Sequence, residues 1–291
     1  MKYRVTHTTA YAYSIPASLS QNEVFLTPRN TPNQNVLSSE LRIVPTPQYM
    51  HRRVDYFGNT GHLFMVQHPH ENLRITAISQ VDTSPLPLPE KQKTLPWEQV
   101  VERLHTSALE QDVMACQYCF ASPMIQLQDD VFQYAARSFV PGVPILEAAL
   151  DIMQRIYADF EYDKDASTVD TSVSEVLGHR KGVCQDFAHL GISCLRSHGL
   201  AARYVSGYLE TIPPQGQPKL VGADASHAWF AVYIPDHGWV DCDPTNNMVP
   251  NDTYVTVAWG RDYSDVAPAK GVVTGGGVHD LTVQVDVARL L

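Results

Sequence analysis

Residues 182–187 are Gly-Val-Cys-Gln-Asp-Phe, and they open the stretch on which the fold of this chain depends. From Cys184 onward, apolar residues recur at helical spacing until Gly199, a residue type that commonly ends helices. Strand patterns then follow at residues 202–206, 227–234 and 239–242. The stretch predicts a helix that packs against an antiparallel sheet, with Cys184 in the first helical turn.

The beginning of the chain has the pattern of a sheet. Residues 54–66 predict a hairpin, because two strand-like runs flank a turn bounded by Gly58 and Gly61. Further strand patterns cover residues 2–13, 41–44 and 73–78. A Pro-rich segment at 84–89 interrupts the strand pattern and predicts a linker.

Helical patterns follow this linker, at residues 97–109, 129–139 and 144–160. Near the end of the chain, residues 281–287 alternate strictly and predict a strand. We therefore expect an α+β protein with two domains. A β-rich N-terminal domain would span residues 1–90, and a core with helices packed on an antiparallel sheet would span residues 91–291.

Composition excludes several classes of function. The 291 residues are 44% hydrophobic and 18% charged, which is typical of a globular protein. A net charge of −10 without a Lys/Arg cluster argues against a nucleic-acid partner. The sequence has no run of about 18 apolar residues, so it predicts no membrane span. Residues 1–7 lack a signal-peptide pattern and the five cysteines form no disulfide-like framework, so we expect a cytoplasmic protein.

Cys184 is a candidate nucleophile because of its place at a helix tip. The unsatisfied N–H groups and the positive dipole end of a helix N-terminus favour a thiolate, and they can stabilise an oxyanion. On its own, however, a cysteine is more often a small core residue.

His227 and Asp243 supply the other two groups that a thiol hydrolase needs. His227 begins one predicted strand, and Asp243 follows the next. If these strands are antiparallel neighbours, the start of one lies beside the end of the other, so the two side chains come within hydrogen-bond reach. Asp241 competes for the orienting role, since alternation places it on the same strand face as Asp243.

Three segments resemble the bacterial branch of the transglutaminase-like superfamily, namely residues 182–209, 225–247 and 259–277. The resemblance implies a papain-related core behind a β-rich N-terminal domain. It also implies a catalytic triad in which Cys184 is the nucleophile, His227 the base and Asp243 the carboxylate that orients the histidine. Papain itself is excluded, because its signature around the nucleophile is missing and the interval from Cys184 to His227 is far shorter.

The expected function is that of a cysteine peptidase or amidase acting on a peptide or protein through a Cys184 thioester. A transglutaminase-type transfer to an amine stays open, as does a non-catalytic peptide-binding module. The sequence shows no clear counterpart of the aromatic side chain that supplements the oxyanion hole in animal transglutaminases, which argues against cross-linking.

The remaining cysteines carry no clear signature. Cys116 and Cys119 form a CxxC without the second half of a zinc site, so we expect neither a metal nor a cofactor. Cys194 and Cys242 fall on apolar faces and are expected in the core. The polar segment 259–265 is expected to form a loop near the cleft, with no role assigned to Arg261 or Asp262.

Overall fold

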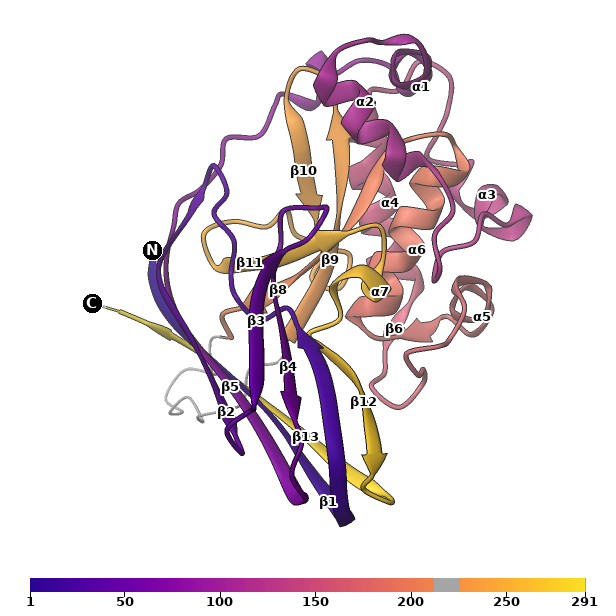
Figure 1. Cartoon of the computed structure of the whole chain (residues 1–291). Helices are drawn as coiled ribbons and strands as arrows, with labels where there is room; N and C mark the ends of the chain where they lie inside the picture. Colours follow the sequence, from indigo (N-terminus) through magenta and orange to yellow (C-terminus); the bar gives the residue numbers. More distant parts are fainter. Residues whose placement is uncertain (212–225, 291) are drawn as a thin grey trace, which may run out of the picture.

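The computed structural model describes residues 1–211 and 226–290. It confirms the α+β class, because an N-terminal sheet stands beside a core in which helices cover a second antiparallel sheet (Figure 1). Residues 84–90, which include the Pro-rich segment, have no regular structure and lead from the first sheet into the helices.

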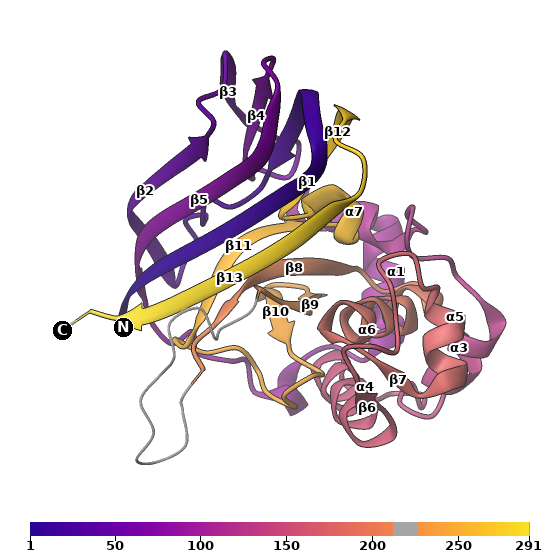
Figure 2. The ribbon, with the colours of Figure 1, turned by 90° about the horizontal axis from the view of Figure 1, so that it is seen from below.

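The N-terminal sheet is built from long antiparallel strands in the order β2-β5-β1-β4-β3. The five strands are β1 (Lys2–Val24), β2 (Gln34–Val44), β3 (Tyr49–Val54), β4 (Thr60–Val66) and β5 (His70–Thr83). The expected hairpin is confirmed, since β3 pairs with β4 across a turn that contains Gly58 at φ 79°. The sheet curls, so that β2 and β3 approach each other although they stand at opposite ends of the order (Figure 2).

The last two strands join this first sheet. β12 (Ala269–Gly275) and β13 (His279–Arg289) both pair antiparallel with β1, so that β13 runs along its first half and β12 along its second. We expected a domain boundary at residue 90, with this stretch in the core. Both strands instead pair with β1 of the N-terminal sheet. Alternation in the sequence indicates that a strand forms, but it does not specify the sheet that the strand enters.

The core sheet has the order β10-β9-β8-β11, with every pair antiparallel as expected. Its strands are β8 (Ala202–Leu209), β9 (Ser226–Ile234), β10 (Gly238–Cys242) and β11 (Tyr254–Gly260). The helices are α1 (Trp97–Thr106), α2 (Glu110–Cys116), α3 (Asp129–Ala135), α4 (Ile145–Asp159), α5 (Val173–His179), α6 (Cys184–Ser197) and α7 (Tyr263–Val266).

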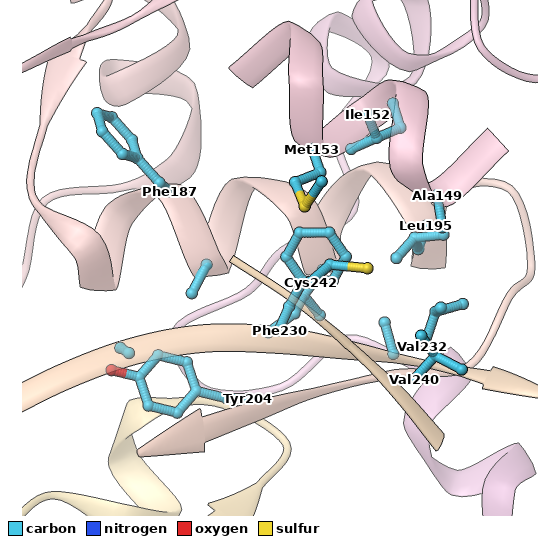
Figure 3. Close-up of a cluster of buried hydrophobic side chains, with 14 of the residues drawn as sticks. Ala149, Ile152, Met153, Phe187, Leu195, Tyr204, Phe230, Val232, Val240 and Cys242 are labelled. Atoms are coloured by element: carbon cyan, nitrogen blue, oxygen red, sulfur yellow. The ribbon is translucent and has the colours of Figure 1, made fainter. Parts of the chain in front are cut away.

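Helix α6 lies directly on this sheet. A Cβ at Gly191 would stand 2.5 Å from the ring of Phe230 in β9, so only glycine allows the helix to approach so closely. Met153 of α4, Phe230 and Cys242 lie together between the helices and the sheet (Figure 3). Cys194 and Cys242 are fully buried, which confirms their expected place in the core.

Specific contacts join the two sheets. The phenol of Tyr3 donates a 3.0 Å hydrogen bond to Glu210, and the amide of Gln34 donates one of 2.7 Å to the carbonyl of Thr256. Arg29, in the segment after β1, stacks on the ring of Trp259 in β11 at 3.2 Å. The N-terminal sheet therefore packs on the edge strand of the core. Within the described residues, none of the helices is long and apolar enough to cross a bilayer.

Candidate active site

Cys184 is the first residue of α6, as expected, and it follows the short strand β7 (Lys181–Gly182). A side chain at Gly182 would collide with Asp186, whose Oδ2 would be 2.7 Å from the added Cβ. This close approach lets Asp186 accept hydrogen bonds from the backbone N–H of Val183, at 2.7 Å, and from the hydroxyl of Ser167. Asp186 therefore links the backbone that leads into the nucleophile to the segment that contains Ser167.

His227 and Asp243 lie within hydrogen-bond reach, as the antiparallel arrangement predicts. Nε2 of His227 is 2.7 Å from Oδ2 of Asp243. β9 and β10 pair antiparallel, and Asp243 directly follows the last residue of β10. Cys184 also lies close enough to His227 for its side chain to raise the pKa of the imidazole. His227 therefore interacts with both the carboxylate of Asp243 and the thiol of Cys184.

The electrostatics of His227 favour the imidazolium. Burial acts to lower its pKa, but the hydrogen bonds and charges of Asp243 and Cys184 outweigh burial and raise the pKa to about 10. The ring is therefore positive at neutral pH. An imidazolium beside a cysteine stabilises the thiolate, which is the nucleophilic form.

The carboxylate of Asp243 is fully buried and saturated with donors. Its Oδ1 accepts from the backbone N–H groups of Thr245 and Asn246, at 2.9 and 3.3 Å. Its Oδ2 accepts from the amide of Asn246 and the phenol of Tyr254, each at 2.7 Å, in addition to His227. Burial alone would raise the pKa of Asp243, but His227, Asn246 and Tyr254 hold it below its usual range. The group remains an anion inside the protein.

Asp241, the competing carboxylate, has a different environment. It pairs with Ala231 in the middle of β9 rather than reaching the end of the strand where His227 begins. Burial raises its pKa, and the charge of Arg203 partly offsets that effect. No hydrogen bond to His227 is recorded for Asp241 among the described residues, so Asp243 is the carboxylate that contacts the imidazole.

Several residues at the site escaped sequence reasoning. Asn246 stands three residues after Asp243 within a segment that the resemblance covers, which is a signal that could have drawn attention to it. Tyr254 lies on β11 and has no such signal, because only the sheet brings it to Asp243.

Two tyrosines adjoin the nucleophile. Burial and then the charge of Cys184 raise the pKa of both Tyr162 and Tyr204. Tyr204 is buried in β8. Tyr162, in β6 (Glu161–Tyr162), pairs with Gly182 and is 56% exposed, so it offers an aromatic surface to solvent beside Cys184.

The segment 259–265 is more ordered than the expected loop. Trp259 and Gly260 end β11, and Asp262 caps α7 by accepting a hydrogen bond from the N–H of Ser264. Asp262 is fully buried and also accepts from the backbone of Met124. Arg261 pairs with Asp265 at 2.9 Å. Both residues therefore have structural partners.

The CxxC pair lies at the end of α2 and in the following 3₁₀ turn, η2 (Gln117–Cys119). Both thiols are free, and burial and the neighbouring Cys116 raise the pKa of Cys119 to about 12. Over the described ranges, no group of three or more His, Cys, Asp or Glu side chains is arranged to hold a metal ion.

Comparison with known proteins identifies the family of this chain. The family described as "Bacterial transglutaminase-like N-terminal region" matches residues 3–82, and the "Transglutaminase-like superfamily" core matches residues 134–244. An uncharacterized protein of Mycobacterium tuberculosis is 42% identical over 98% of this chain and 92% of its own length.

Two further proteins are informative. A crystal structure from Cytophaga hutchinsonii, described as that of a candidate cysteine protease, superposes with a TM-score of 0.75 at 24% identity, over 99% of this chain and 90% of that one. A protein-glutamine gamma-glutamyltransferase of Pseudomonas aeruginosa is 36% identical, but only over 24% of this chain and 11% of its own length. The chain belongs to the transglutaminase-like superfamily, a family of cysteine-dependent enzymes.

Proposed function

We propose that this protein is a cysteine peptidase or amidase that cleaves an amide bond through a thioester on Cys184. The observation that carries the proposal is the place of His227, whose Nε2 is 2.7 Å from the buried carboxylate of Asp243 and whose pKa is raised by Asp243 and Cys184. A carboxylate that is fully saturated and anionic fixes the ring orientation and stabilises its positive charge, which is the role of the third group in known triads.

In the first step, the Cys184 thiolate attacks the amide carbonyl carbon and forms a tetrahedral oxyanion. The first N–H groups of α6 have no intrahelical partner, so they are available to stabilise that charge. The C–N bond then breaks, and His227 gives its proton to the departing amine. The thioester and a neutral imidazole remain.

In the second step, His227 takes a proton from water, and the resulting hydroxide equivalent attacks the thioester carbonyl. The C–S bond breaks, releasing the carboxylic acid and restoring the thiolate and imidazolium. An amine in place of water would yield a new amide, which is the transferase alternative. The similarity to a gamma-glutamyltransferase over a quarter of the chain is the observation that keeps this alternative in view.

Selective thiol labelling separates an enzyme from a non-catalytic module. Cys119, Cys194 and Cys242 are buried, and burial raises the pKa of each, so these thiols should react slowly with iodoacetamide. We expect stoichiometric labelling of Cys184 far ahead of the rest, and slower labelling of Cys184 in His227→Gln. Uniform labelling of all five thiols would contradict the proposal.

Substrate profiling then distinguishes hydrolysis from transfer. A peptide library that contains unmodified and N-substituted glutamine side chains should identify which amide is cleaved. Release of ammonia or peptide without an added primary amine indicates a hydrolase, whereas dependence on the amine indicates a transferase. We propose a peptide or protein substrate in the cytoplasm, and no nucleic-acid or membrane partner.

A further inference from the structure

The curled N-terminal sheet borders a half-open cavity of about 540 Å³, away from the residues of the candidate active site. It is lined by residues of β2, β3, β4 and the segment after β1: Thr27, Pro28, Arg29, Asn30, Val36, Ser38, Ser39, Leu41, Arg52, Gly58, Thr60 and His62. β2 and β3 stand at opposite ends of the strand order, so the cavity is the inside of the curl (Figure 2). The interiors and mouths of closed or nearly closed sheets are common places for small ligands.

The charged side chains that line this cavity are opposite in sign to the net charge of the chain. The net charge is −10, yet Arg29, Arg52 and His62 line the cavity, and no Asp or Glu of the described residues does. Arg52 and His62 are direct partners in the β3–β4 register, so their side chains project from the same sheet face. Four hydroxyl side chains, those of Thr27, Ser38, Ser39 and Thr60, complete a polar lining.

Polar atoms at this place lack partners. His62 is 8% exposed, and its Nδ1 is buried without a hydrogen bond. Nε of Arg29 is also buried and unpartnered, although Nη1 of the same group is held by the carbonyl of Phe57 and the side chain of Asn59. Within the described part of the chain, Arg52 has no recorded ion pair. Buried polar atoms without partners cost free energy, so a cluster of them indicates a place for a polar ligand.

We propose that the cavity binds a small polar molecule through its oxyanion, a phosphate or a carboxylate, between Arg52, His62 and Arg29. Guanidinium and imidazole donors match the acceptor oxygens of such a group. The hydroxyl groups would bind the rest of the ligand, and the volume lies within the range of small-molecule sites. Arg29 also stacks on Trp259, so the ligand would sit where the N-terminal sheet meets the core.

Calorimetric titration of the full chain with inorganic phosphate and, separately, with citrate tests this proposal. The ionic strength is held constant with chloride, because screening would otherwise mimic a specific effect. We expect saturable binding of one equivalent of at least one of the two probes, and the pair distinguishes a phosphate from a carboxylate preference. Absence of saturable binding of both probes at millimolar concentration would overturn the proposal.

Two variants and one control locate the binding. Arg52 is exposed, so Arg52→Gln and Arg52→Glu should fold with an unchanged unfolding temperature in the absence of the probe. We expect Arg52→Gln to weaken binding about tenfold or more, and Arg52→Glu to abolish it. The control is Arg53→Gln, since Arg53 pairs with Glu23 outside the cavity lining. Equal weakening in Arg53→Gln, or none in Arg52→Glu, would contradict the site.

Discussion

The phenol of Tyr254 donates a 2.7 Å hydrogen bond to Oδ2 of Asp243, the same oxygen that lies 2.7 Å from Nε2 of His227. Tyr254 begins β11 at one edge of the core sheet, whereas Asp243 follows β10 at the other end of the strand order. Burial and then the charge of Asp243 raise the pKa of Tyr254, so the phenol stays protonated and remains a donor. Tyr254 is thus a positioning residue for the proposed chemistry.

Replacing Tyr254 by Phe should lower kcat about three- to tenfold with little change in KM, because one hydrogen bond to the orienting carboxylate is lost. The measurement is steady-state kinetics on the substrate identified by profiling. Tyr233→Phe is a matched control, since the phenol of Tyr233 donates to Asp112 at 2.6 Å, outside the site. That variant should lose stability and keep kcat; an equal loss of kcat in both would argue against a positioning role.

Exchanging Asp243 for Asn should reduce kcat by roughly 10³- to 10⁴-fold, as loss of the carboxylate does in other triads. The asparagine amide cannot stabilise the imidazolium, and it can impose the wrong ring tautomer. Asp241→Asn should leave kcat within a few-fold of the parent, since Asp241 pairs in the middle of the sheet instead of contacting His227. A larger effect at Asp241 than at Asp243 would reverse this assignment.

The pH profile of kcat/KM should fall on the alkaline side as His227 loses its proton, near its pKa of about 10. The proposed first step requires the imidazolium, so activity is present below that pKa and lost as pH rises through it. In Asp243→Asn the same limb should move to lower pH, because Asp243 helps to raise the pKa of His227. A limb that stays in place in this variant would show that another group governs it.

Cys184→Ala should abolish turnover and leave the fold intact. The side chain is only partly buried at the first turn of α6, so truncating it removes little packing. Circular dichroism and the unfolding temperature verify the fold, and product formation over long incubation measures residual activity. A Cys184→Ala protein that kept full activity would rule out the thioester.

Acid should destabilise the protein partly through His7, which is buried between the two sheets. Its ring hydrogen-bonds with Thr9 and with the phenol of Tyr208, each at 3.0 Å. Burial lowers the pKa of His7 to about 4, below the value near 6.5 of an unfolded histidine. Between these values the unfolded chain binds more protons, so stability is present above pH ~6.5 and is lost as pH falls toward 4.

Urea unfolding at about pH 7 and about pH 4.5 measures this loss. The difference in the free energy of unfolding should shrink in His7→Gln, although buried His189, whose pKa burial also lowers to about 4, contributes in the same direction. His105→Gln, at an exposed helix position, should keep the parental difference. An unchanged difference in His7→Gln would exclude His7 as a source.

Much of the fold was predictable because its signals are local. Helical spacing after Cys184 and the glycine at 199 defined α6, and alternation located β8, β9 and β10. The hairpin around Gly58 was predictable for the same reason, since turn residues and flanking strands are neighbours in the chain. Helices α2 and α5, each seven residues long, escaped prediction, whereas α3 of the same length was predicted within the longer pattern at residues 129–139.

Some features of the candidate site were likewise predictable from local patterns, and others were not. Local spacing and alternation were enough to predict that Cys184 begins a helix, that His227 begins one strand and that Asp243 follows the next. Three other features became visible only in the folded chain: Tyr254 reaches Asp243, β12 and β13 pair with β1, and Arg29 and Arg52 line one cavity. Each of these depends on which distant strands pair and how a sheet curls, and no local pattern encodes that choice.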